Sequence, residues 1–286
     1  MKSKPCCPMS IRALHLILAA AISGCADTGK TTSRQQVIDQ VAATQLKEEP
    51  VEPDEILMRM ARFLAGSQRF GVKLQSSYDV VQESGQKIEF GETRSITVSR
   101  PNGLRIEVER SDGEKHFVLY DGRDVTVYDS SKNVYAQTAK SDGIDEAIKY
   151  FLRDLHMRLP LALLLVSDLP EEIESRTLSL AYVESTVISG VPVDHLAGRT
   201  ETVDYQVWIE KGARPLPLRV VLTYKDAVGQ PQFQARFSDW NLAPKISDSF
   251  FVFTPPKGAH KIAFLAELPK IAIKGTASPA QSGKQK

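Results

Sequence analysis

The sequence predicts a mainly β (α+β) domain, built from one large curled antiparallel sheet with helices between its two halves. Most of the chain alternates apolar and polar residues with a period of two, which is typical of strands with one buried face. Asn-Gly and Asp-Gly pairs separate several of these strands and favour hairpin turns. In the middle of the chain the apolar spacing lengthens to three and four residues, which predicts helices. A sheet of this length is expected to curl around an apolar interior.

The folded domain is expected to span residues 54–265 and to begin with a helix. Asp54 is a suitable cap for that helix. The apolar stripe of the helix consists of Leu57, Met60, Ala61 and Leu64. A stripe of this kind is expected to cover one face of the sheet.

The first half of the sheet follows this helix. The predicted strands span 72–80, 86–100, 103–110, 115–121, 124–129 and 133–137. Asn102-Gly103, Asp112-Gly113 and Asp121-Gly122 lie between strands as hairpin signals. We therefore expect neighbouring strands to pair in sequence order.

Helices and the second half of the sheet come next. A second amphipathic helix is predicted through Ile144, Ile148, Phe151 and Leu155, and Pro160 is suited to open a third helix through LALLLV. Further strands are predicted at 179–188, 191–198, 202–211, 216–225 and 230–240. No period long enough for a solenoid or a propeller is present.

The N-terminus has the pattern of a bacterial lipoprotein signal peptide, residues 1–24. Lys2, Lys4 and Arg12 precede an apolar run that is too short to span a bilayer, and the run ends in ISGC. This tetrapeptide resembles a lipobox, in which Cys25 is lipidated and becomes the mature N-terminus. Cys6 and Cys7 would leave with the signal, so the exported chain would form no internal disulfide.

Two polar segments flank the expected domain. Residues 25–53, which end within the polar run KEEPVEPDE, are expected to form a flexible tether, and residues 266–286 a disordered tail. By resemblance to enteric lipoproteins, Ala26 after the lipidated cysteine favours transport to the outer membrane, although Asp27 weakens this. Removing the signal changes 36 Lys plus Arg against 35 Asp plus Glu into 33 against 35. A near-neutral chain of this kind is not expected to bind nucleic acid.

Several segments together resemble a known fold family. These are ITVSRPNGLRIEVE, YDGRDVTVYDSSKNVYAQ, VWIEKGARPLPLRVVLTYKDAVGQPQFQARFSDW and DSFFVFTPPKGA. Their order is similar to that of the lipoprotein-localisation fold, which is shared by the LolA carrier, the LolB acceptor and the RseB sensor. DYQVWIEKGARPLP and FSDWNLAP look closer to a group of bacterial predicted periplasmic proteins of unknown function. The resemblance implies an unclosed barrel whose concave side is covered by helices and which holds acyl chains in relatives that carry lipoproteins.

The leading hypothesis is therefore an outer-membrane-anchored periplasmic lipoprotein whose apolar concavity binds acyl chains of a lipid or lipoprotein. The expected lining consists of Leu57, Met60, Leu64, Phe117, Leu119, Tyr205, Val207, Val220, Leu222, Phe233 and Phe237. The same side chains would also suit a filled core, and the strand pattern leaves both readings open. Trp208 and Trp240 have the opposite parity, which favours the outer face or contact with the covering helices.

Catalysis is the competing class of function, and we expect no enzyme activity and no cofactor. Asp194 and His195 are adjacent in a strand, so their side chains are expected to point to opposite faces. His116, His156 and His260 lack the spacing of metal ligands, and no G-x-S-x-G sequence is present. The alternatives are an envelope sensor that binds a protein partner without lipid cargo and, less favoured, a cell-envelope hydrolase.

Overall fold

A computed structural model describes residues 52–154 and 159–264 of the protein. The chain separates into two units, Met1–Glu49 and Pro50–Lys286, and the described residues belong to the second. The signal sequence, Cys25, most of the tether, Leu155, His156 and the C-terminal tail lie outside the described residues. Among the described helices, none is both long and apolar enough to cross a membrane.

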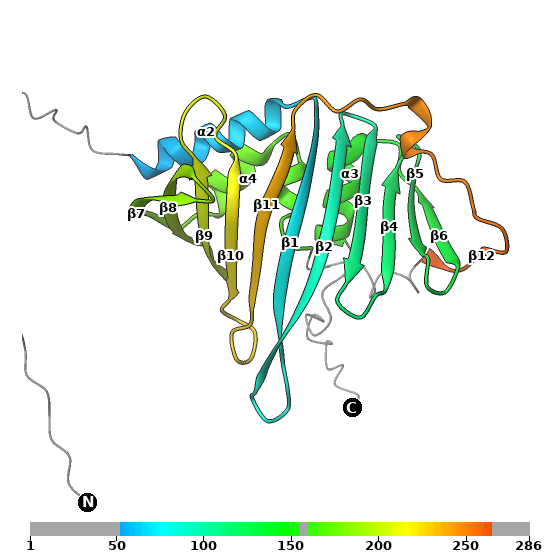
Figure 1. Ribbon diagram of the computed structural model, residues 1–286, viewed down its shortest axis with the longest axis horizontal. Coiled ribbons are helices and arrows are strands. Elements are labelled where there is room, and N and C mark those ends of the chain that lie inside the picture. Colours follow the sequence, from blue (N-terminus) through cyan, green and yellow to red (C-terminus); the bar gives the residue numbers. More distant parts are fainter. Residues whose placement is uncertain (1–51, 155–158, 265–286) are drawn as a thin grey trace, which may run out of the picture. The chain divides into compact units, whose positions relative to one another are not determined.

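One sheet of 12 strands dominates the described part of the chain (Figure 1). The strands are Arg69–Val81 (β1), Lys87–Ser99 (β2), Gly103–Arg110 (β3), Lys115–Tyr120 (β4), Asp124–Asp129 (β5), Val134–Ala139 (β6), Ser179–Ile188 (β7), Val191–Arg199 (β8), Val203–Glu210 (β9), Pro217–Tyr224 (β10), Gln232–Asn241 (β11) and His260–Lys261 (β12). Their order in space is β12-β6-β5-β4-β3-β2-β1-β11-β10-β9-β8-β7. The sheet ends in β12 and β7, which do not pair, so it is not closed into a barrel.

Two meanders make up this sheet. Strands β1 to β6 pair consecutively, as do β7 to β11, and β1 joins the halves by pairing antiparallel with β11. All pairs are antiparallel except that of β12 with β6, where His260 lies opposite Val134. The expected large, unclosed, mainly antiparallel sheet is therefore confirmed, with the short parallel strand as an addition.

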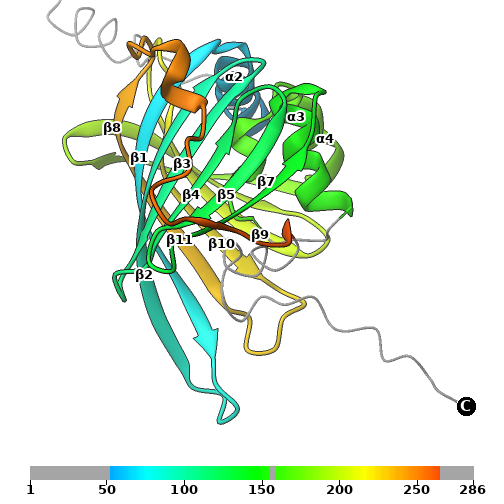
Figure 2. The ribbon, with the colours of Figure 1, turned by 90° about the vertical axis from the view of Figure 1, so that its right-hand side faces the viewer.

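Helices cover the concave face of the curled sheet (Figure 2). They are α2 (Pro53–Gly66), α3 (Gly143–Lys149), the π-helical turn η1 (Tyr150–Asp154), the 3-10 turn η2 (Ala162–Leu165) and α4 (Leu169–Arg176); a further 3-10 turn, η3, spans Asp248–Phe251. The apolar stripe of α2 is buried as predicted, with Leu57, Met60 and Leu64 at most 2% exposed. These side chains pack with the inner face of both meanders in one core.

The helix boundaries differ from the sequence prediction in two places. Helix α2 begins at Pro53 with Glu52 as its N-cap, because proline tolerates the first helical position and Asp54 and Glu55 then face the positive end of the helix dipole. Pro160 opens no α-helix. Leu161 has a φ of 66°, which breaks the helical path, and only η2 follows.

Helix α4 is an element that the sequence pattern does not predict. Pro170 lies in its first turn, and Leu169 and Glu172 are its buried residues. Its amphipathic pattern is weak because the helix has only about two turns and half of its residues are charged. Together, α2, η2 and α4 form the layer that faces β9 and β10, and the functional candidate lies beneath it.

Candidate functional site: an apolar cavity beneath the helices

A cavity of about 530 Å³ lies between this helical layer and strands β9 and β10. Its apolar lining consists of Leu57, Met60, Leu152, Leu159, Pro160, Leu161, Leu163, Leu164, Leu169, Ile173, Val203, Tyr205, Val207, Val220, Leu222 and Tyr224. The volume is within the range of small-molecule sites, about 300–1,000 Å³. Apart from Arg153, Glu172 and Arg176, no charged residue lines it within the described chain.

The floor of the cavity comes from alternate positions on two paired strands. Tyr205 of β9 lies opposite Leu222 of β10, and Val207 lies opposite Val220. Side chains at these positions share one face of the sheet, because residues alternate between faces along a strand. The period-two pattern in both strands thus produces a continuous apolar floor.

Tyr205 is held in place from two sides. Its hydroxyl group lies 3.0 Å from Oγ1 of Thr177, which follows α4, and its ring lies over Gly198 of β8. A Cβ atom on Gly198 would come within 2.1 Å of the ring, so only glycine leaves room for it. Burial raises the pKa of Tyr205, and the hydrogen bond with Thr177 partly opposes this shift.

A charged cluster lies at the solvent side of the cavity. The Glu172 carboxylate is buried, whereas the Arg153 and Arg176 side chains are about half exposed. Arg176 donates to Oε2 of Glu172 through Nε at 2.8 Å and Nη2 at 2.6 Å, and Arg153 pairs with Oε1. One carboxylate therefore neutralises only one of the two guanidinium charges.

A second, smaller apolar cavity of about 90 Å³ lies under the first meander. Residues of α3, η1 and strands β1 to β5 line it, together with Arg94. Leu159, Pro160 and Leu161 line both cavities, so this short segment separates them. The left-handed backbone of Leu161 is unusual for a non-glycine residue and lies at this partition.

The predicted lining residues fall into three groups. Leu57, Met60, Tyr205, Val207, Val220 and Leu222 line the large cavity. Leu64, Phe233 and Phe237 belong to the buried core instead and line neither apolar cavity. Phe117 and Leu119 lie on the other face of β4, since Val118 and Tyr120 are the residues of that strand that line the small cavity.

The placement of Phe117 and Leu119 has a simple cause. Four successive apolar residues, from Phe117 to Tyr120, occupy β4, so alternation does not identify the inner face. Phe117 packs on the outer face, 5.9 Å from the Tyr128 ring and 5.6 Å from the Arg105 guanidinium carbon. These two positions are therefore corrected and play no part in the proposed ligand contact.

The cavity also uses residues that the sequence does not indicate as lining. They come from the η2 segment and α4, with Leu161, Leu163 and Ile173 as examples. The apolar run LALLLV is a visible signal, but its pattern alone predicts an ordinary helix. The pairing of Arg153 with Glu172 joins residues 19 positions apart, and no sequence spacing points to it.

The tryptophans lie on different faces. Trp208 packs on the outer face between His195 and Arg219. The centroid of its ring lies 4.0 Å from that of the His195 ring and 4.6 Å from Cζ of Arg219. Trp240 instead joins the inner core, stacked 5.8 Å from Phe237. A β-bulge in β11, where Asp239 has a φ of 53°, shifts the parity between Phe237 and Trp240 and so brings both rings to the inner face.

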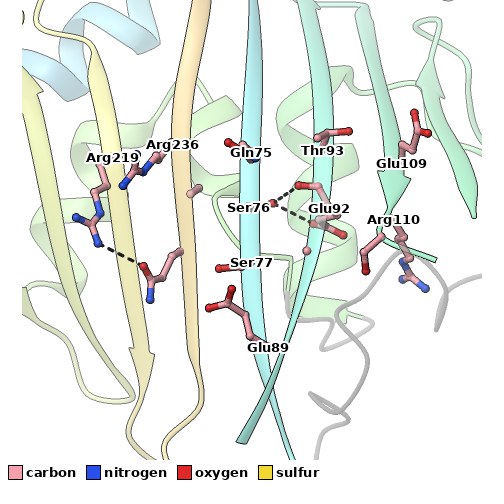
Figure 3. A pocket seen from close by; sticks show the side chains of 14 residues that line it. Gln75, Ser76, Ser77, Glu89, Glu92, Thr93, Glu109, Arg110, Arg219 and Arg236 are labelled. Atoms are coloured by element: carbon pink, nitrogen blue, oxygen red, sulfur yellow. Dashed lines mark hydrogen bonds between the residues drawn. The ribbon is translucent and has the colours of Figure 1, made fainter. Parts of the chain in front are cut away.

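A polar depression of about 610 Å³ lies on the outer face of the sheet (Figure 3). Gln75, Ser77, Thr93, Arg219 and Arg236 are among its lining residues. Arg219 donates to Oε1 of Gln234 at 3.3 Å. The lining is a mixed polar surface without a second apolar wall, so it resembles an ordinary solvated sheet face.

The catalytic candidates do not converge. His195 stacks on Trp208 at the outer face, whereas Asp194 accepts from the Tyr182 hydroxyl group at 3.1 Å and lies 3.0 Å from Lys211 Nζ. Their opposite orientation agrees with the prediction from strand geometry. Among the described residues, no group of three or more His, Cys, Asp or Glu side chains is placed to hold a metal ion.

A buried polar group lies elsewhere on the inner face. His116 is 1% exposed and lies opposite Asp129, and its Nε2 atom is 3.5 Å from Oε2 of Glu114. Burial lowers the pKa of His116, although the nearby Asp129 carboxylate opposes this shift. The side chain is therefore expected to be neutral at pH 7.

Comparison with solved structures finds similar folds at low identity. An uncharacterised conserved protein from Thermus thermophilus is 14% identical over 73% of this chain and 97% of its own, with a TM-score of 0.44. The Mycobacterium tuberculosis lipoprotein LppX is 15% identical over 68% and 100%, with a TM-score of 0.41. A LolA superfamily protein from Nitrosomonas europaea is 11% identical over 71% and 99%, with a TM-score of 0.39. Such values are too low to transfer a function.

Comparison with families of proteins is more specific. No protein of curated function matches the sequence. The model of one family, described as predicted periplasmic protein (DUF2092), matches residues 53–265. This match covers the whole described domain, from the first residue of α2 to the end of the described chain. The chain therefore belongs to the DUF2092 family of predicted periplasmic proteins.

Proposed function

We propose that this protein holds an acyl chain of a lipid or lipoprotein in the large cavity beneath α2 and α4. The observation that supports this proposal is a space of about 530 Å³ whose floor and roof are both apolar. Removing apolar ligand surface from water contributes about 25 cal/mol per Å². A chain that buries roughly 300 Å² would thus gain about 7.5 kcal/mol before the cost of association, without any polar contact.

The proposed selectivity for the chain itself is low. Leucine side chains form much of the roof, and strand residues such as Val207 and Leu222 form the floor. Such surfaces make non-directional contacts, which discriminate weakly between chains of similar shape. One added methylene changes the free energy of binding by only about 0.8 kcal/mol.

We further propose that a lipid on Cys25 anchors the protein to the outer membrane. The ISGC sequence and the periplasmic family support this placement. Mass spectrometry of the N-terminus from purified envelopes tests the modification, and fractionation of the two membranes tests the location. An unmodified chain that begins elsewhere would refute the anchor without affecting the cavity.

Titration with a fluorescent fatty acid tests the cavity. Leu222→Glu places a carboxylate on the floor and is expected to weaken binding more than tenfold, because a charge in an apolar space is strongly unfavourable. Thr223→Glu is the matched control, since Thr223 follows Leu222 on β10 and its side chain lies on the outer face. There its hydroxyl group accepts a hydrogen bond from Gln232. Thermal unfolding of both variants establishes that they are folded.

The expected result is saturable binding to the wild type and to Thr223→Glu, with loss in Leu222→Glu. Lipid extraction of the purified wild-type protein provides a second measurement, in which a co-purified acyl chain supports the proposal. Equal binding by all three proteins, or no saturable binding by the wild type, would reject it.

A second candidate function is recognition of a protein partner at the edge strand β7. Within the described sheet, β7 is one of the two terminal strands, and its exposed apolar residues include Val183 at 49% and Val187 at 61%. An open edge of this kind can accept a strand from another protein. This supports the sensor alternative, which requires no lipid cargo.

Crosslinking in intact envelopes distinguishes the two functions. A photoreactive amino acid at Val187 is expected to capture a specific protein if β7 is an interface, and one at Val228, 87% exposed in the β10–β11 loop, is the control. A Val187 adduct together with an empty cavity would favour the sensor. Absence of any adduct specific to Val187 would remove the second candidate.

A further inference from the structure

The charged cluster at the large cavity contains more positive than negative groups. Arg153 and Arg176 each carry a positive charge, and Glu172 is the single carboxylate of the lining among the described residues. The two arginine side chains are 55% and 49% exposed, so they lie where the cavity meets solvent. An excess of one positive charge thus borders an otherwise apolar space.

The buried carboxylate positions both arginines. Glu172 is 6% exposed, and each of its oxygen atoms is engaged, Oε1 by Arg153 and Oε2 by Arg176. A guanidinium group has five N–H donors, and Arg176 uses only Nε and one Nη2 hydrogen on Glu172. Within the described chain, its other donors are therefore available to a second anion at the solvent side.

From this arrangement we infer that the ligand is an amphiphile with an anionic head group, a carboxylate or a phosphate, held by Arg153 and Arg176 while its chain occupies the cavity. The inference rests on the proposed acyl-chain function and adds the class of head group. Carboxylates and phosphates are the anions that the guanidinium fork binds best. The hydroxyl groups of Thr177 and Tyr205 form a hydrogen bond with each other. The two arginines are therefore the charged groups that would contact the head group.

A simpler explanation is that Arg176 and Glu172 form an ordinary pair one helical turn apart. The two residues are four positions apart on α4, and such pairs are common on helix surfaces. That explanation accounts for neither the third member, Arg153 from η1, nor the burial of the carboxylate beside an apolar cavity. It also predicts that head-group charge does not affect binding, which makes the two explanations separable.

A matched ligand series tests the inference on the purified protein. Dodecanoate, dodecyl phosphate, monododecanoylglycerol and dodecyltrimethylammonium share one chain length and differ in head-group charge. At low salt, the anions are expected to bind about fivefold more tightly than the neutral ester, and the cation most weakly, because a half-exposed ion pair contributes up to about 1 kcal/mol. This preference is expected to shrink at about 0.5 M salt.

Three variants extend the test in opposite directions. Arg176→Gln and Arg153→Gln are each expected to bring anionic and neutral ligands close to equal affinity. Glu172→Gln removes the competing carboxylate and is expected to increase the preference for anions. Arg236→Gln is the control for loss of one positive charge, since Arg236 lies on the outer face. Thermal unfolding identifies any variant that fails to fold.

The outcomes separate this inference from the proposed function. If all four ligands bind equally and no variant changes their order, the head-group inference is overturned while acyl-chain binding stands. If no ligand binds the wild type, the acyl-chain function itself fails. Tighter binding of dodecyl phosphate assigns a phospholipid-type ligand, and tighter binding of dodecanoate assigns a fatty-acid type.

Discussion

The ring of Tyr205 lies directly over Gly198 on the neighbouring strand, at a position where any side chain on residue 198 would overlap it. The two residues are a cross-strand pair of β8 and β9, and the glycine lets the aromatic ring lie flat against the sheet. The floor of the proposed acyl site therefore depends on the absence of a side chain at residue 198.

Gly198→Ala is expected to displace Tyr205 into the cavity. A Cβ atom would lie 2.1 Å from Cζ of the ring, so the ring must move, at a cost of about 1–3 kcal/mol in the free energy of unfolding. Fatty-acid affinity is expected to fall as well. Urea unfolding and ligand titration measure both effects.

Gly91→Ala provides the control for a glycine in a strand. Its nearest foreign atom would be the Ser76 carbonyl oxygen at 3.8 Å, an ordinary contact. In a Tyr205→Ala background, which lacks the ring, the same Gly198→Ala change should cost much less. If Gly198→Ala and Gly91→Ala change stability equally, Gly198 is not required for steric reasons in the cavity floor.

Leu161→Gly is expected to join the two apolar cavities. Leu161 lines both, and its φ of 66° costs a non-glycine residue roughly 1–2 kcal/mol. Relief of this strain offsets the lost apolar contacts, so we expect little net change in stability. Titration with fatty acids of increasing length should show a shift in preference toward longer chains.

Leu163→Ala is the matched variant for that experiment, because Leu163 lines only the large cavity. It is expected to change affinity without a shift in the preferred chain length. An identical length profile for Leu161→Gly and the wild type would show that the segment does not separate the two spaces for a ligand.

His116 is expected to make the protein less stable in mild acid. Burial lowers its pKa below the ordinary value of 6.5, so the unfolded chain binds a proton at a pH where the folded chain does not. The contribution of neutral His116 to the free energy of unfolding is therefore fully present above pH 6.5 and decreases as the pH falls below it. The slope is at most about 1.4 kcal/mol per pH unit for one proton.

Urea unfolding between about pH 5 and pH 7.5 measures this dependence, a window above the range where most carboxylates titrate. His116→Leu is expected to flatten the curve, and His260→Leu, at an exposed position, should leave it unchanged. An equal dependence of stability on pH in His116→Leu and the wild type would contradict the role of His116 in acid destabilisation.

Gly103→Ala is expected to loosen the segment that contains η3. The Phe251 ring packs over Gly103, and an added Cβ atom would lie 2.5 Å from Cε2 of that ring. We expect a loss of about 1–3 kcal/mol in the free energy of unfolding. In a Phe251→Ala background the same change should cost much less, and additive effects in this double-mutant cycle would disprove the contact.

Local sequence pattern accounts for most of the sheet. Hairpin signals such as Asp121-Gly122 lie where β4 turns into β5, and the alternation in β9 and β10 correctly identifies Tyr205 and Leu222 as inner residues. Both features act over a few neighbouring residues, since turn geometry and strand parity are local properties. The same locality makes the apolar stripe of α2 visible.

Tertiary structure decided which inner residues face open space. Met60 and Phe233 are both buried and apolar, yet Met60 lines the large cavity and Phe233 fills the core, because the positions of η2 and α4 leave the larger gap over β9 and β10 rather than over β11. The bulge at Asp239 and the grouping of Arg153 with Glu172 likewise arise from contacts between distant segments. Sequence by itself determined where strands and the first helix form, since those depend on neighbouring residues; the cavity and its charged border depend on packing across the whole sheet.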